Sequence, residues 1–103
     1  MNDTKMNDTM YAKLIYAKLY EVLVMAGDRA SIGKGRERHS DGEPFTDQYI
    51  CRAPKIFGLG SLLYQIGKKN EEIMRLDTKE SKINELLDII VYAAAGVILL
   101  KGS

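Results

Sequence analysis

The sequence predicts an all-α protein, an antiparallel bundle of three to four helices with a long glycine-bearing loop after the first helix. Three observations lead to this class. Apolar residues recur at steps of three and four in several segments, no segment shows sustained strand alternation, and residues 27–44 are polar and rich in glycine. With 103 residues, 46% of them hydrophobic, we expect a single helical domain over residues 10–103 after a flexible N-terminus at residues 1–9.

The first helix is expected over residues 10–26, where the apolar residues follow helical spacing. Asp8 or Thr9 can cap its start, and Gly27 is a natural end. Residues 27–44 then form the long loop. Loops of this length in a small domain are usually functional or disordered.

Three further helices are expected after the loop. A short one over residues 47–57 is bent by Pro54, which lacks a backbone donor. The next covers residues 61–75 with Ser61 as its cap, and residues 76–79 form a turn. The last and strongest covers residues 81–101 and ends at Gly102.

The last helix contains twelve consecutive apolar residues, at positions 89–100. A membrane-spanning helix needs roughly 20. Extending the run toward its N-terminus brings in Glu85 and Asp88, which would be costly in hydrocarbon. We therefore expect the core helix of a bundle rather than a membrane span.

Charge and cysteine content exclude several classes of function. Lys and Arg total 15 and Asp and Glu total 14, and this near balance argues against binding duplex nucleic acid. The single cysteine, Cys51, excludes an internal disulfide framework and a cysteine-based zinc site, and we expect it to be buried. A reducing compartment, the cytoplasm, is the expected location.

Glu85 and Asp88 are the candidate metal ligands. Their spacing of three places both carboxylates on one face of the last helix, and Tyr92 continues that line. Two such carboxylates can share a hard cation such as Mg²⁺. The alternative is that Glu85 pairs with Lys82 while Asp88 faces water.

The segment around these carboxylates, ELLDIIVYAAAGVILL at residues 85–100, resembles the last helix of MazG-like all-α nucleoside triphosphate pyrophosphohydrolases, including phage members of that group. Those enzymes carry Glu-x-x-Asp on such a helix, matched here by Glu85 and Asp88. The resemblance implies a helical fold, a nucleotide ligand and Mg²⁺. The second motif of the family, Glu-x-x-Glu on the preceding helix, is absent here. Asp47 or Glu72 would have to replace it in space.

Cationic residues in and after the loop are the candidate ligand-binding groups. Arginine suits bidentate phosphate contacts, and loop glycines let the backbone approach a ligand. Interleaved acidic residues leave the loop nearly neutral, and the alternative is a solvated connection. The candidate ligand-binding residues are Arg29, Lys34, Arg36, Arg38, His39, Thr46, Arg52, Lys55 and Tyr92.

Three functions compete. The first is binding of a nucleotide or cyclic nucleotide without turnover, as in a phage protein that sequesters a signal used in host defence. The second is Mg²⁺-dependent cleavage of a nucleoside triphosphate, which the missing carboxylate motif disfavours. The third is a protein–protein interaction module. We also expect a homo-oligomer, because the apolar faces of the first and last helices exceed what a thin bundle covers.

Overall fold

The structure is a computed structural model that describes residues 2–32 and 42–102, and in that part of the chain all regular structure is helical. The predicted all-α class is confirmed. The helices are α1 (Asn2–Ile15), α2 (Ala17–Ser31), α4 (Tyr49–Phe57), α5 (Gly60–Glu72) and α6 (Lys79–Lys101). Two short 3-10 helices, η1 (Phe45–Asp47) and η2 (Ile73–Arg75), precede α4 and follow α5.

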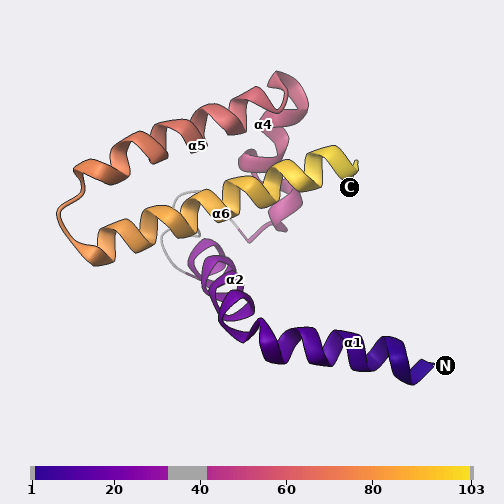
Figure 1. The fold of residues 1–103 in the computed structure, drawn as a ribbon. Coiled ribbons are helices and arrows are strands. Elements are labelled where there is room, and N and C mark those ends of the chain that lie inside the picture. Colours follow the sequence, from indigo (N-terminus) through magenta and orange to yellow (C-terminus); the bar gives the residue numbers. More distant parts are fainter. Residues whose placement is uncertain (1, 33–41, 103) are drawn as a thin grey trace.

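Helix α6 is the element on which the others assemble. It packs against α2, α4 and α5 (Figure 1). The turn after η2 reverses the chain, so that α5 and α6 lie side by side in opposite directions, whereas α2 meets the middle of α6 with its C-terminal end. An antiparallel bundle of all the helices stays a prediction.

The first predicted helix differs from the observed one in three ways. The segment forms two helices, α1 and α2, because the backbone departs from helical geometry at Tyr16 (φ −109°, ψ 26°), and the chain changes direction there. It begins at Asn2, so Asp8 and Thr9 lie inside α1 and do not cap it. It also continues through Gly27 to Ser31. Whether residues 1–9 are flexible stays a prediction.

The continuation past Gly27 has a tertiary cause. Glycine inside a helix costs about 1 kcal/mol relative to alanine, which is why it predicted an end. Here the residues on either side of it face α6: Ala26 is buried, and Arg29 bonds to a side chain of α6. These contacts exist only in the folded chain and outweigh a local preference of that size.

The last helix follows its sequence signals closely. It begins two residues earlier than expected, at Lys79, because the Oγ1 of Thr78 accepts a hydrogen bond from the backbone N–H of Ser81 at 3.0 Å. It ends at Gly102, as predicted, in the left-handed conformation (φ 76°) that glycine adopts without strain.

By length and composition α6 could cross a membrane. An 18-residue window of this 23-residue helix has a mean hydropathy of 1.9, and 17% of that window is buried. In the structure α6 contacts three other helices, and two of its acidic residues, Glu85 and Asp88, pair with cations of two of them.

The small core lies where α4, α5 and α6 meet. Cys51, Leu62 and Ala95 are buried there, so the predicted burial of Cys51 is confirmed, and burial raises the pKa of its thiol. Gly96 of α6 faces the side chains of Leu59 and Leu62, and a β-carbon at this position would be in ordinary van der Waals contact with both. Pro54, predicted to bend α4, lies inside that helix and is fully buried.

Candidate functional site

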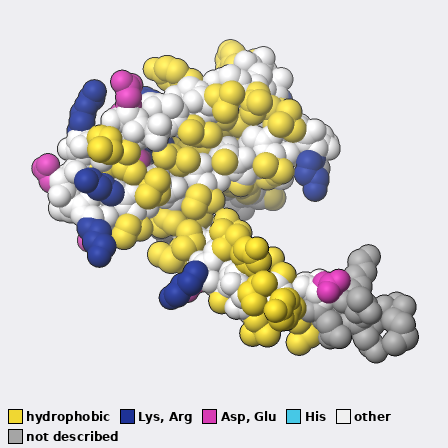
Figure 2. Space-filling view, in the orientation of Figure 1, with side chains coloured by type: hydrophobic (Ala, Val, Ile, Leu, Met, Phe, Trp, Pro, Cys, Tyr) yellow, Lys and Arg dark blue, Asp and Glu magenta, His cyan; other side chains and the backbone are white. Residues whose placement is uncertain are grey.

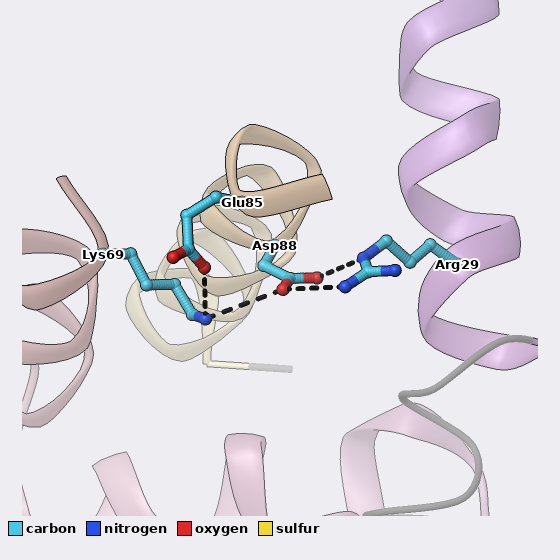
Figure 3. A network of polar contacts seen from close by, with 4 residues as sticks. All are labelled: Arg29, Lys69, Glu85 and Asp88. Atoms are coloured by element: carbon cyan, nitrogen blue, oxygen red, sulfur yellow. Dashed lines mark hydrogen bonds and ion pairs between the residues drawn. The ribbon is translucent and has the colours of Figure 1, made fainter. Parts of the chain in front are cut away.

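Four charged side chains from three helices form one network (Figure 3). Arg29 comes from the last turn of α2, Lys69 from the last turn of α5, and Glu85 and Asp88 from α6. Their side chains are only 12–23% exposed. We call these four residues the charged quartet. It links α2 and α5 to α6 at a partly buried point.

Asp88 is the centre of the quartet. Its two carboxylate oxygens accept from the Nε of Arg29 at 2.7 Å and from the Nη2 at 3.3 Å, a bidentate arrangement. The Nζ of Lys69 lies 3.6 Å from the Oδ2 of Asp88. Hydrogen bonding to Asp88 is the main reason that the pKa of Arg29 is raised, so this guanidinium stays charged.

Lys69 bridges both carboxylates. Its Nζ donates to the Oε1 of Glu85 at 2.9 Å and also faces Asp88, while it lies 5.8 Å from the centre of the Tyr92 ring. Burial lowers the pKa of Lys69, but the hydrogen bond to Glu85 and the charges of both carboxylates raise it by more. The ammonium group therefore occupies the position between Glu85 and Asp88 that a shared cation would take.

The alternative expected for these two carboxylates, in which Glu85 pairs with Lys82 and Asp88 faces water, is wrong. Glu85 pairs with Lys69 and not with Lys82, and Asp88 faces two cations rather than water. Among the described residues, no group of three or more His, Cys, Asp or Glu side chains could hold a metal ion. Neither Asp47 nor Glu72 thus completes a carboxylate cage with the pair on α6.

Lys69 is the quartet residue that sequence reasoning missed. It is not among the candidate site residues predicted from the sequence. A signal was present: positions 69 and 85 are equally far from the turn at Asp77. In two antiparallel helices joined by a short turn, residues at equal distances from that turn lie at a similar level along the pair. The rotation of each helix then decides whether their side chains meet, as those of Lys69 and Glu85 do.

A cavity of about 630 Å³ lies beside the quartet, between α2 and α6. Its walls are mostly apolar, with a few polar groups contributed by Ser31, Glu43 and Gln48. The side-chain amide of Gln48 donates to the backbone carbonyl of Glu43 at 3.1 Å, which closes one end of this wall. The lining residues are Leu23, Ala26, Gly27, Ala30, Ser31, Gly42, Glu43, Phe45, Gln48, Ile90, Val91 and Ala94.

No quartet residue lines the cavity, but the quartet joins the helices that form its walls. The Arg29–Asp88 pair joins α2 to α6, the same two helices that form opposite walls, and Val91 in the wall lies one helical turn beyond Asp88. The ion pair therefore sets the spacing of the two walls. Ser31 and Gly42, the flanks of the segment at residues 33–41, both line the cavity.

The remaining candidate ligand-binding residues are dispersed. Thr46 is exposed in η1, and Arg52 and Lys55 are exposed on α4, where the Arg52 guanidinium lies 6.0 Å from the centre of the Tyr49 ring. Tyr92 packs against the core cluster. The other candidates lie outside the described residues: Lys34, Arg36, Arg38 and His39.

Comparison with known proteins identifies no relative. No family model, no curated protein and no solved structure matches the chain. The functional interpretation therefore depends on the quartet and the cavity.

The Lys69–Glu85 bond predicts a specific pH dependence of stability. Because the pKa of Lys69 is raised in the folded protein above its ordinary value of 10.5, its contribution is complete below that pH and is lost as the pH rises through the folded-state pKa. We expect wild type to be more stable than Lys69→Met in urea unfolding at pH 7 and 9, and this difference to shrink above pH 10.5. A difference that stays constant across this range would contradict the assignment.

Proposed function

We propose that this protein is a cytoplasmic binding protein for a nucleotide-type ligand, which it holds without turnover, as a phage protein that sequesters a nucleotide signal of host defence would. The cavity between α2 and α6 carries the proposal. Its volume, about 630 Å³, falls within the range of about 300–1,000 Å³ typical of small-molecule sites. A mostly apolar wall with a few polar groups suits a base, which needs stacking area and a small number of hydrogen bonds.

Connectivity supports an anionic ligand. The segment that joins Ser31 to Gly42 carries Lys34, Arg36, Arg38 and His39, and both of its flanks line the cavity. Cations on a chain segment anchored at the cavity wall are suited to phosphates, which arginine binds through two parallel hydrogen bonds.

The quartet argues against turnover. Hydrolysis of a triphosphate requires divalent cations that neutralise the phosphates and position a water. The carboxylates that resemble the pyrophosphohydrolase motif, Glu85 and Asp88, are already neutralised by Arg29 and Lys69. A Mg²⁺ ion at this pair would have to displace a lysine held at 2.9 Å from Glu85. A carboxylate pair that is already neutralised by two protein cations is suited to holding helices together and poorly suited to binding a metal ion.

The test is a panel of nucleoside mono-, di- and triphosphates and cyclic dinucleotides, each with Mg²⁺ or with chelator, assayed for thermal stabilisation and for released pyrophosphate. We expect at least one nucleotide to raise the melting temperature independently of Mg²⁺, with no pyrophosphate formed. Arg36→Ala and Arg38→Ala should each weaken binding by about 1.5–3 kcal/mol, roughly 10- to 150-fold. The matched control is Arg75→Ala, which removes an exposed arginine of η2 at the far end of α5.

Two results would replace this proposal. Pyrophosphate released by the unaltered protein, and abolished both by chelator and by Asp88→Asn, would identify a Mg²⁺-dependent pyrophosphohydrolase. If no nucleotide raised the melting temperature, the remaining candidate function would be that of a protein–protein interaction module. For a binding protein, Asp88→Asn changes affinity modestly and to the same extent with and without metal.

A further inference from the structure

Helix α1 and the first half of α2 project from the body of the molecule (Figure 1). Among the described elements, α1 packs to an appreciable extent only on α2. The radius of gyration is 15.9 Å, against roughly 13 Å for a compact chain of about 100 residues. We call residues 10–25 the arm. Its exposed position is the reason that the molecule is extended.

The arm exposes large apolar side chains over most of its surface. Eleven large apolar side chains on it are between 38% and 75% exposed, and Figure 2 shows hydrophobic side chains gathered along the visible face of this projecting part. A helix that is apolar all round is normally buried inside a protein or in a membrane. These side chains are Met10, Tyr11, Leu14, Ile15, Tyr16, Leu19, Tyr20, Val22, Leu23, Val24 and Met25.

The exposed area is that of a stable interface. With 150–250 Å² for a whole tyrosine side chain, the three tyrosines of the arm alone leave roughly 250–400 Å² uncovered. The eight aliphatic and methionine side chains add at least as much again. The total approaches about 800 Å², which is what each partner contributes to a standard protein–protein interface. A monomer would keep this surface in water.

Charge and length select a protein partner over a membrane. Lys13, Lys18 and Glu21 interrupt the apolar surface, so the arm lacks the roughly 20 apolar residues of a membrane span. Lys18 and Glu21 form an ion pair at 3.6 Å, and the arm has no strongly basic face to attract anionic lipid. A nearly neutral apolar surface with scattered charges of both signs is suited to a copy of itself.

We propose that the arm is the surface through which two copies of this chain associate, arm against arm, in a two-fold symmetric interface. Such an interface uses the same patch on both subunits and is the commonest form of homo-oligomer. The arms cover each other's apolar side chains, and the body of each copy, with its charged quartet, stays on the outside. This association does not depend on the proposed ligand.

The test compares matched charge insertions by light scattering and sedimentation at micromolar concentration. We expect the unaltered protein to have at least twice the monomer mass of 11.6 kDa. Leu14→Lys and Leu19→Lys, both at exposed positions of the arm, should give monomers with unchanged helical circular dichroism. The control, Met74→Lys, inserts the same charge at an equally exposed apolar position in η2, away from the arm, and should leave the mass of the oligomer unchanged.

Cross-linking gives an independent measurement. The native cysteine, Cys51, is buried, so a cysteine introduced on the arm is the most reactive thiol in the protein. Leu14→Cys should form a covalent dimer with a short bis-maleimide, and Met74→Cys should not. The proposal is overturned by a monomeric unaltered protein, by arm variants that keep the oligomer mass, or by a monomer that sediments with phosphatidylcholine–phosphatidylglycerol vesicles. Nucleotide binding is measured separately, so either proposal can fail alone.

Discussion

Replacing Leu62 by alanine should lower the free energy of unfolding by about 2–5 kcal/mol. Leu62 is 3% exposed and lies in the core cluster with Cys51 and Ala95, beneath Gly96 of α6. Removing its isobutyl group loses the transfer free energy of the buried atoms and leaves a cavity between two backbones that are already held close together. How far the partly buried side chains packed against the cluster move into this space decides where in that range the loss falls.

The adjacent residue provides the control. Leu63 lies on the same helix and is 56% exposed, so Leu63→Ala changes the same atoms and the same helix propensity outside the core. We expect this variant to remain within about 0.5 kcal/mol of wild type in urea unfolding. Equal losses for the two variants would mean that α5 does not pack on α6 as described.

Replacing Asp88 by asparagine should lower the free energy of unfolding by about 1.5–3 kcal/mol at neutral pH. The substitution preserves the size of the side chain but removes the charge that both Arg29 and Lys69 face. It leaves two partly buried cations with Glu85 as their remaining carboxylate. An uncompensated charge in a partly desolvated position is more costly than the loss of an exposed ion pair.

Asp77→Asn is the matched control, because Asp77 is exposed in the turn before α6 and we expect almost no effect there. A double-mutant cycle with Arg29→Met separates the pairwise interaction from the rest of the substitution. The observation that would refute the quartet is a coupling energy of zero between positions 29 and 88. Loss of α2 packing in Asp88→Asn should also change the cavity, so nucleotide affinity is to be measured on the same variant.

The sequence by itself determined the helices whose signals are local. Helix α6 ends at Gly102 because glycine adopts a positive φ without strain. It begins after the turn at Thr78 because the side chain of this threonine caps its first turn. Apolar residues at helical spacing identified the all-α class.

Only the tertiary structure decided what depends on contacts between distant segments. Arg29 and Asp88 are 59 residues apart, and nothing in local spacing indicates that they meet. The same contact between α2 and α6 accompanies the continuation of α2 past Gly27. It also places α2 as one wall of the cavity and brings Arg29 to the carboxylate of Asp88. Local propensities differ by about 1 kcal/mol per residue, and burial against another helix exceeds that. The break at Tyr16, which sends the arm away from the body, has no proline or glycine to announce it.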